Sequence, residues 1–403
     1  MTHLVLALDP LLITGVGLRE VIIVAIKVVV AFVIMLIAVI LMIWFERKVI
    51  AGFQNRIGPN KAGPWGIMQT LADGLKLVFK EYIQPERSDR FVFLLAPFLA
   101  VVPVFVTFAI VPVGGDFSNG NDGVVSILGR DTLLQVADPP IGILLMLAMS
   151  AVAVYGAMLA GWSSGSKYPL LGSVRASAQM VSYEAALGLS IATVLVVSGT
   201  LSTNGIVVGQ DGLRNWNIIA TGVVPFIVFF LAVTAEMNRP PFDLTEAEQE
   251  LVGGYQTEYS SMRFAMYYLA EFLATVVMSA VTITLFLGGP RGLFDIPVIP
   301  NAIEGSLWLL AKLLVFLFAY VWLRATLPRY RYDQLMDLGW KLLIPVAFGW
   351  LLLITSLKVA QDEGWNRVFV VVVALAAAAA AWGLFALALK VSTRNREVEG
   401  SSF

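Results

Sequence analysis

Long apolar segments separated by short polar connections make up most of this chain. A membrane-spanning helix needs about 20 consecutive apolar residues, because every backbone N–H and C=O group must be satisfied within the segment. About nine segments meet that requirement, near residues 20–45, 91–113, 137–160, 177–199, 218–237, 262–287, 305–325, 340–359 and 367–389. The pattern predicts an all-α, polytopic membrane helix bundle.

One connection has a helical pattern without the length of a span. Between Gly66 and Ile83 the apolar residues recur at the spacing of one helix face, and Asp73, Lys76 and Lys80 fall between them. We expect an amphipathic helix at the membrane interface. A helix that simply rests on lipid or on a neighbouring protein would show the same pattern.

The cations are distributed unevenly between the two sets of connections. If the N-terminus lies outside, 19 of the 27 Lys and Arg residues fall on the inner side. Cytoplasmic connections carry such an excess, so the sequence predicts an outer N-terminus and a cytoplasmic C-terminus. We expect one membrane domain over 1–403, with an eight-span core at about 15–360 and a ninth span and tail at about 365–403.

Composition argues against several kinds of chemistry. Hydrophobic residues make up 58% and charged residues 14% of the chain, a balance typical of a protein solvated by lipid. The net charge of −1 argues against nucleic acid as a partner. There is no Cys and one His, His3, whereas iron–sulfur clusters, haem and catalytic zinc need thiolate or imidazole ligands. We therefore expect no metal site and no redox centre in this chain.

Acidic residues inside the predicted spans are the first candidates for function. Glu46 ends the first span, Glu184 lies within the fourth, Glu236 ends the fifth and Glu271 lies within the sixth. Each is unfavourable in the membrane unless it is paired, hydrated or protonated. Any one of them could be a structural ion pair, but four such acids in one bundle favour a functional role.

The connection after the fifth span is strongly acidic. From Glu236 to Glu258 it contains a single base, Arg239, and these acids: Glu236, Asp243, Glu246, Glu248, Glu250 and Glu258. A local explanation is that Pro240-Pro241 ends one helix and Thr245 caps another whose first turn favours acids. Alternatively, carboxylates at close range titrate as a coupled set and can store and pass protons without histidine.

Two further connections combine cations with aromatic residues. The segment from Glu46 to Gly66 alternates cations, Gly-Pro pairs and aromatics, and it lacks the Gly-Lys-Ser/Thr ending of a phosphate loop. It could be a basic loop on the cytoplasmic side or a wall for a lipid-soluble ring. The segment that follows the seventh span suits lipid headgroups or the docking of a protein, through Arg324, Arg329, Arg331 and Asp333.

Taken in order, these motifs resemble one family over nearly the whole chain. It is the complex I family that includes subunit 1 of the mitochondrial enzyme and its equivalent in bacterial NADH-quinone oxidoreductase. The resemblance rests on motifs that include Glu46-Arg47-Lys48, Gly58-Pro59-Asn60, Ser182-Tyr183-Glu184, Glu236 to Asp243 and Leu327 to Gln334.

The resemblance implies a membrane subunit of a proton-translocating NADH:quinone oxidoreductase in the bacterial inner membrane. Its partners would be the other membrane-arm and hydrophilic-arm subunits, membrane lipids, and ubiquinone or menaquinone as substrate, with FMN and iron–sulfur clusters only in partner subunits. By the resemblance, the quinone channel is bordered by Arg47, Phe53, Arg56, Trp65, Met68, Asp73, Arg239 and Phe242. The acids that link it to proton translocation are Glu46, Glu184, Glu236, Asp243, Glu246, Glu248, Glu250, Glu258 and Glu271.

Two other classes of membrane protein remain open at this point. The membrane subunit of a proton-linked hydrogenase would use a similar scaffold without a quinone. A secondary transporter would show paired repeats and helices interrupted near mid-membrane, whereas the Gly-Pro and Pro-Pro breaks of this chain fall at the ends of its predicted spans.

Overall fold

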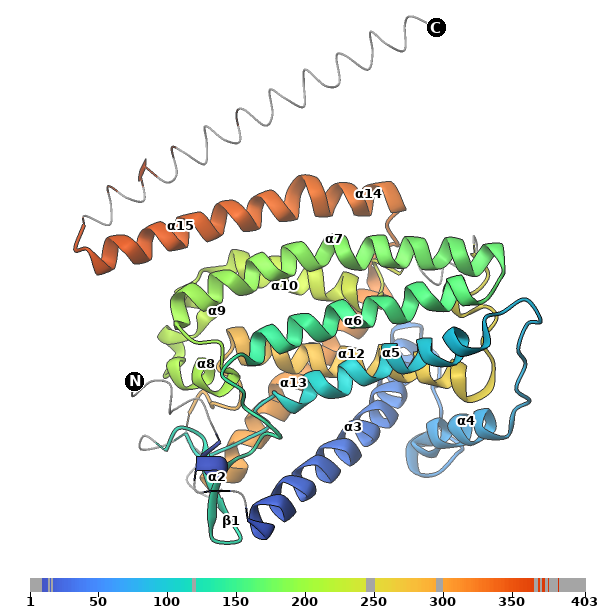
Figure 1. Ribbon diagram of the computed structural model, residues 1–403, viewed down its shortest axis with the longest axis horizontal. Coiled ribbons are helices and arrows are strands. Elements are labelled where there is room, and N and C mark those ends of the chain that lie inside the picture. Colours follow the sequence, from blue (N-terminus) through green and yellow to red (C-terminus); the bar gives the residue numbers. More distant parts are fainter. Residues whose placement is uncertain are drawn as a thin grey trace, which may run out of the picture.

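The computed structural model describes residues 9–13, 15, 17–117, 121–243, 251–294 and 300–365, together with 369, 372, 373, 376 and 383. The predicted ninth span therefore lies almost wholly outside the described residues, and so do Glu246, Glu248 and Glu250 of the acidic connection. Within the described ranges the chain is a bundle of long helices (Figure 1).

Seven helical units in the described residues are long and apolar enough to cross a membrane. They are α3 (Leu18–Phe53), α5 (Arg90–Ala109), α6 (Gly142–Ser163), α7 (Lys167–Ser198), α12 (Ser261–Phe286), α13 (Asn301–Thr326) and a last unit made of α14 (Tyr332–Asp337), the π-helix η4 (Leu338–Leu343) and α15 (Ile344–Asp362). They correspond to all the predicted spans except the fifth and the ninth. The prediction of an all-α, multi-pass membrane bundle is confirmed.

Two helices are longer than the apolar pattern predicts. α3 continues to Phe53, so Glu46 and Arg47 lie on its last turns rather than in a connection. No glycine or proline follows Glu46 until Gly52, one residue before the helix ends. α7 begins at Lys167, ten residues before the predicted 177, because Pro169 falls in its first turn, where proline is tolerated.

The predicted fifth span is not one continuous helix. It consists of α9 (Asn217–Ala220) and α10 (Val223–Glu236), which are separated at Gly222, a residue with φ of 80°. The Trp350 indole donates a hydrogen bond of 2.7 Å to the carbonyl of Thr221 at this break. Because α10 has 14 residues, it is about 21 Å long at 1.5 Å per residue, which is less than the thickness of the hydrocarbon core.

The two ends of the bundle differ in structure. One end, named here the hairpin end, carries short elements: α2 (Pro10–Ile13), α8 (Thr203–Gly209), η2 (Leu213–Asn215) and the antiparallel strands β1 (Val124–Ile127) and β2 (Arg130–Leu133), which pair Val124 with Leu133. The opposite end, named the loop end, carries η1 (Pro64–Gly66), the amphipathic helix α4 (Met68–Phe79) and η3 (Gly254–Gln256). The sequence pattern does not predict the hairpin, because its strands are only four residues long.

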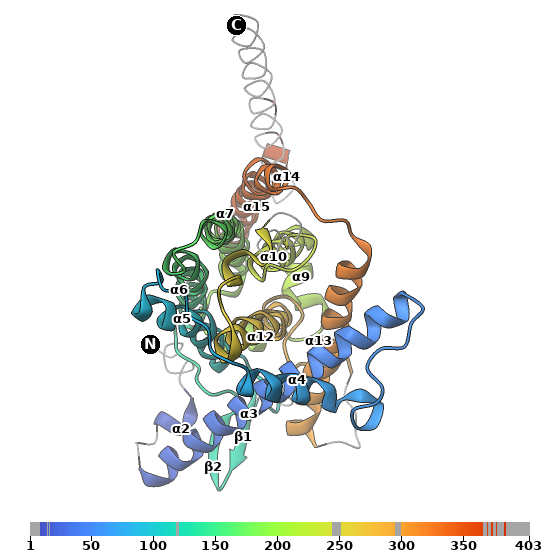
Figure 2. The same cartoon turned by 90° about the vertical axis from the view of Figure 1, so that its right-hand side faces the viewer.

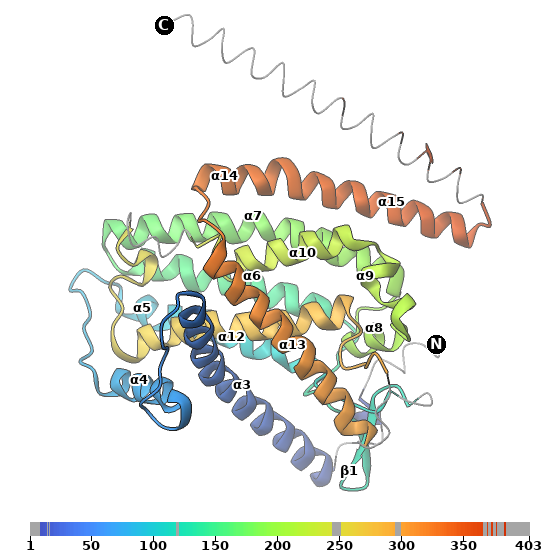
Figure 3. The ribbon, with the colours of Figure 1, turned by 180° about the vertical axis from the view of Figure 1, so that it is seen from behind.

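Helix α12 occupies the middle of the bundle (Figure 2), and almost all of its second half is buried. Helices α3 and α13 cross the other helices obliquely on one side (Figure 3). Elsewhere the helices approach closely through glycine: a Cβ atom at Gly156 of α6 would lie 2.7 Å from the backbone nitrogen of Ala100 of α5.

Candidate functional site

The turn that follows α10 is attached to α7 by hydrogen bonds. The side-chain amide of Gln179 donates to the carbonyls of Ala235 at 2.7 Å and Phe242 at 2.8 Å. Within the turn, the backbone N–H of Arg239 donates to the carbonyl of Thr234 at 3.3 Å. These contacts fold the chain back on itself, so that the Arg239 side chain lies inside the bundle, where it is 3% exposed.

Arg239 is the centre of a buried group of charges. Its Nη1 lies 2.6 Å from Oε2 of Glu46, and its Nε forms an ion pair of 3.1 Å with Oε1 of Glu271. Its guanidinium carbon lies 4.3 Å from the ring centroid of Phe272. Arg324 pairs with the other oxygen of Glu46. We name Glu46, Arg239, Glu271 and Arg324 the arginine–carboxylate cluster.

A cavity lies between the end of α3, the loop that follows it, α12 and α13. This cavity, the α3 cavity, has a volume of about 450 Å³. The predicted residues Glu46, Arg47 and Arg56 line it, together with Tyr268, Phe272 and Arg324. It therefore combines three cations and one carboxylate with aromatic rings.

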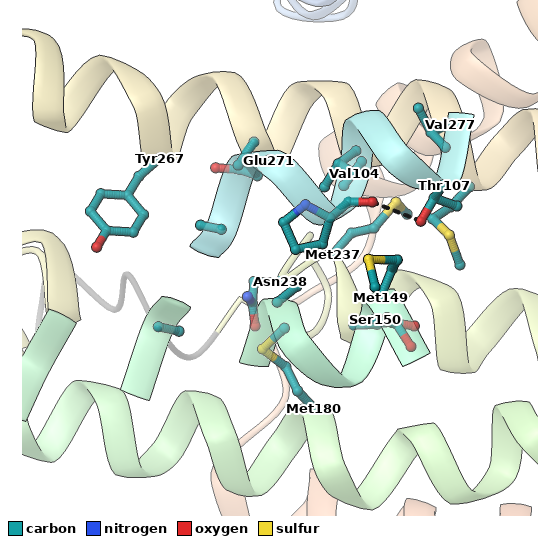
Figure 4. A pocket seen from close by; sticks show the side chains of 18 of the residues that line it. Val104, Thr107, Met149, Ser150, Met180, Met237, Asn238, Tyr267, Glu271 and Val277 are labelled. Atoms are coloured by element: carbon teal, nitrogen blue, oxygen red, sulfur yellow. Dashed lines mark hydrogen bonds between the residues drawn. The ribbon is translucent and has the colours of Figure 1, made fainter. Parts of the chain in front are cut away.

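A second cavity lies among α5, α6, α7, α10 and α12. This central cavity has a volume of about 100 Å³ (Figure 4). Besides methionines and small apolar residues, the lining includes these polar residues: Thr107, Ser150, Glu236, Asn238, Tyr255, Gln256, Tyr267 and Glu271. Oε2 of Glu236 is buried and has no hydrogen-bond partner among the described residues. Glu184 of α7 lies close enough to Glu236 to interact with it electrostatically, and Ser150 lies beside both carboxyl groups.

The arginine–carboxylate cluster separates the two cavities. Glu46 lines the α3 cavity and Glu271 lines the central cavity, and one guanidinium, that of Arg239, pairs with both. A change of charge on either carboxylate therefore acts on the other through a shared partner. In this low-dielectric interior such an interaction is much stronger than in water.

The turn after α10 also contacts the second basic segment. The ring of Phe242, 1% exposed, stacks on Tyr330 with centroids 5.6 Å apart. Asp243 pairs with Arg329 at 2.9 Å, and the backbone N–H of Tyr330 donates to the carbonyl of Pro241 at 3.1 Å. Of the four residues predicted to dock a partner, Arg324 and Arg329 are thus engaged within the chain. Arg331 and Asp333 are exposed near the start of α14.

Helix α4 confirms the amphipathic helix predicted between Gly66 and Ile83, and it is joined to α3 at two points. Arg47 pairs with Asp73 at 2.7 Å, and the Trp44 indole donates to the carbonyl of Trp65 at 3.0 Å. Partial burial would raise the pKa of Asp73, but the hydrogen bonds from Arg47 and Gln69 outweigh it and lower this pKa below its ordinary value. The apolar face of α4, which includes Met68, is exposed.

Some predicted residues lie apart from both cavities. Phe53 contacts Phe318 across α3 and α13, with centroids 6.3 Å apart, and Trp65, 72% exposed, lies at the start of the α4 segment. Glu258 is partly exposed before α12, and the structure gives it no ion pair among the residues that it describes. Conversely, sequence reasoning missed Ser150 and Tyr267, because uncharged residues in apolar spans give no signal of their own, and it assigned no role to Asn238, which directly follows the predicted fifth span.

Comparison with known proteins identifies the family of the chain. Residues 26–355 match the family described as NADH dehydrogenase. The chain is 47% identical over 339 residues to a protein of Frankia casuarinae and 48% identical over 340 residues to one of Frankia alni, and both relatives are described as the H subunit of NADH-quinone oxidoreductase. Each match covers 84% of this chain and 73% of the relative. The chain therefore belongs to the NADH dehydrogenase family and is a membrane subunit of complex I, an oxidoreductase assembled from several subunits.

Proposed function

We propose that this protein forms part of the quinone passage of the complex and links quinone reduction to proton translocation. The observation that carries the proposal is the position of Arg239, which pairs with a carboxylate of each cavity. In the proposal the α3 cavity receives the quinone head group, and the acids at the central cavity respond to its reduction.

The lining of the α3 cavity suits a quinone. Arg47, Arg56 and Arg324 place positive charge where a quinone oxygen becomes negative on reduction. Tyr268 and Phe272 supply aromatic surface for the ring. Beyond the cavity, the exposed apolar face of α4 gives an isoprenoid tail a contact at the membrane interface. The quinone would be ubiquinone or menaquinone.

The central cavity suits proton storage. Reduction of a quinone by two electrons consumes two protons. A negative charge that forms on the quinone in the α3 cavity repels the carboxylate of Glu46, which lines this cavity. Arg239 would then shift its balance toward Glu46 and weaken its pairing with Glu271, which favours proton uptake by Glu271. Glu236 lines the same cavity, and Glu184 interacts electrostatically with Glu236. Both residues therefore extend the set of acids.

The remaining parts of the proposal concern the assembly. Electrons would come from iron–sulfur clusters and FMN in partner subunits, because this chain has no Cys and one His. Arg331 and Asp333, exposed near the start of α14, would contact such a partner. The loop end would face the cytoplasm, in agreement with the excess of cations in its connections.

The test compares Glu236→Gln and Glu271→Gln in the assembled complex. In inverted membrane vesicles, NADH oxidation by a short-chain quinone and proton uptake are measured together, and NADH oxidation by a water-soluble acceptor reports the amount of complex. We expect both variants to lose most of the proton uptake and quinone turnover at unchanged complex content. Glu304→Gln is the matched control, because Glu304 is buried and lines neither cavity. Full pumping and turnover in both test variants would contradict the proposal.

A further inference from the structure

A group of tyrosines adjoins the central cavity. Tyr267 of α12 packs edge-on against Tyr255 and Tyr259, with ring centroids 5.3 and 5.0 Å apart. Tyr259 in turn stacks on Phe93 of α5 at 4.0 Å. All four side chains are buried. Aromatic packing accounts for the rings, but it does not require their hydroxyl groups.

The hydroxyl of Tyr267 is buried without a hydrogen-bond partner among the described residues. Tyr267 is 2% exposed and lines the central cavity one helical turn before Glu271, as Figure 4 shows. A buried hydroxyl of this kind is unfavourable unless ordered water satisfies it. The cavity, about 100 Å³ in volume, has room for several waters. Tyr267 and the carboxylates of Glu236 and Glu271 line the same cavity, so water in it would lie between them.

Tyr259 continues the series of hydroxyls toward the loop end. Its ring packs edge-on against that of Tyr267, and its hydroxyl lies 3.5 Å from that of Ser163. Ser163 is the last residue of α6, two residues before the exposed Gly165. Its carbonyl accepts a hydrogen bond of 3.0 Å from the backbone N–H of Asp89, an exposed residue. The hydroxyls therefore reach from the central cavity to just beneath the polar surface.

We infer that Ser163, Tyr259 and Tyr267 form a proton inlet from the loop end to Glu271 and Glu236. In each transfer a hydroxyl donates its proton to the next group and receives one from the group behind it. No hydroxyl therefore gains or loses charge overall, and no electron moves. The inference rests on the proposed function and adds the route by which the central cavity is protonated.

Charged groups surround the inlet on more than one element. Glu258 precedes Tyr259 in the chain and is partly exposed, and Asp89 is exposed beside Ser163. The guanidinium of Arg263 lies over the rings of Tyr82 at 3.9 Å and Phe93 at 5.4 Å. Glu271 is the charged group at the inner end. Glu258 and Asp89, at the outer end of the inlet, can bind protons from the solvent. The guanidinium of Arg263 packs on the rings of Tyr82 and Phe93.

The test uses Tyr259→Phe and Tyr267→Phe, which keep the rings and remove one oxygen atom. Quinone turnover and proton uptake of the assembled complex are measured in inverted vesicles in water and in deuterium oxide across a range of pH. We expect turnover to fall about fivefold, which corresponds to about 1 kcal/mol. We also expect a steeper decline at high pH, a larger solvent isotope effect and an unchanged KM for quinone.

Tyr320→Phe is the matched control. Tyr320 is 3% exposed, its hydroxyl also lacks a partner among the described residues, and it lines neither cavity. It stacks on Phe230 at 5.0 Å, between α13 and α10. The Tyr320→Phe variant removes a buried hydroxyl outside the inlet, so it measures how much the loss of such a group affects the complex through packing alone. We expect it to leave the pH profile and the isotope effect as in the wild type.

The outcomes separate this inference from the proposed function. If the double variant Tyr259→Phe/Tyr267→Phe keeps the wild-type pH profile and isotope effect while Glu271→Gln lowers pumping, the inlet is wrong and the proposed function stands. If Glu236→Gln and Glu271→Gln are themselves fully active, both fail. If a tyrosine variant does not assemble, as measured with the water-soluble acceptor, Ser163→Ala is judged by the same criteria.

Discussion

The guanidinium of Arg239 is stable inside the bundle because several groups replace its water. Two carboxylates and the face of the Phe272 ring surround it, and loss of one partner from a buried ion pair costs roughly 3–5 kcal/mol. A lysine would not replace it, because an ammonium group lacks the planar fork that reaches Glu46 and Glu271 together. The identity of this residue is thus set by the number and directions of its partners.

At the same scale, the pair between Arg47 and Asp73 predicts a pH dependence for the attachment of α4. Because the pKa of Asp73 is lowered in the folded protein, the pair contributes stability above the ordinary Asp pKa and loses it only as pH falls through the lowered value. We expect Asp73→Asn to reduce the hydrogen-exchange protection of α4 at neutral pH. In the wild type the protection should fall only below about pH 3.9.

Asp337→Asn is the control for that measurement. It removes a surface carboxylate that pairs with Lys341 on the last helical unit, so the protection of α4 should not change. Equal protection of α4 in Asp73→Asn and the wild type at neutral pH would show that the Trp44 contact and membrane burial alone hold this helix.

Individual residues of the site could be predicted from the sequence only where burial is costly. Glu46 and Glu271 stood out because charge is unfavourable at depth, whereas Arg239 stood out as the single base of an acidic connection. Their pairing could not be predicted, since Glu46 and Arg239 are 193 residues apart in the chain. Tyr267 gave no signal, because a tyrosine in an apolar span is an ordinary packing residue.

At the scale of elements, hydropathy located the spans well and their ends poorly. A search for apolar segments ends a predicted helix where polar residues begin. It therefore missed the continuation of α3 through Glu46 and Arg47. It also averages over short breaks, so that Thr221 and Gly222 were included in one span. That break adjoins the hairpin end rather than the site, in contrast to the mid-membrane breaks of transporters (Figure 1).

Close helix contacts give a prediction for two glycines. A Cβ atom at Gly156 would lie 2.7 Å from the backbone of Ala100, whereas one at Gly188 of α7 would meet nothing within 4 Å. We expect Gly156→Ala to destabilise the α5–α6 contact by about 1–3 kcal/mol, with lower thermal stability of the purified complex. Gly188→Ala should be neutral or slightly stabilising, since alanine favours a helix. A thermal-shift measurement that ranks the two variants equally would refute this account of the packing.

For the molecule as a whole, the two ends of the bundle differ in what their charged residues do. The hairpin end is stabilised by contacts such as the ion pair of 2.9 Å between Lys27 and Asp9. Both cavities that carry predicted acids lie toward the loop end or in the middle of the bundle. Sequence reasoning singled out the acids that line these cavities, but it could not predict which helices enclose each cavity.

The orientation in the membrane can be tested because the chain has no cysteine. Ser126 of β1 and Lys80, which follows α4, are exposed at opposite ends. We expect an impermeant maleimide to label Ser126→Cys in right-side-out vesicles and Lys80→Cys only in inverted vesicles. The reverse pattern would place the loop end outside and contradict the distribution of cations.

The arginine–carboxylate cluster has one further consequence, which concerns electroneutrality. The cluster has two guanidinium groups and two carboxylates, so its formal charges cancel when both carboxylates are ionised. A proton that joins either carboxylate leaves an excess positive charge beside the α3 cavity, and the most favourable compensation is an anion drawn into that cavity. A semiquinone or quinol anion would be such a counter-ion, so occupancy by protons and by reduced quinone would rise and fall together.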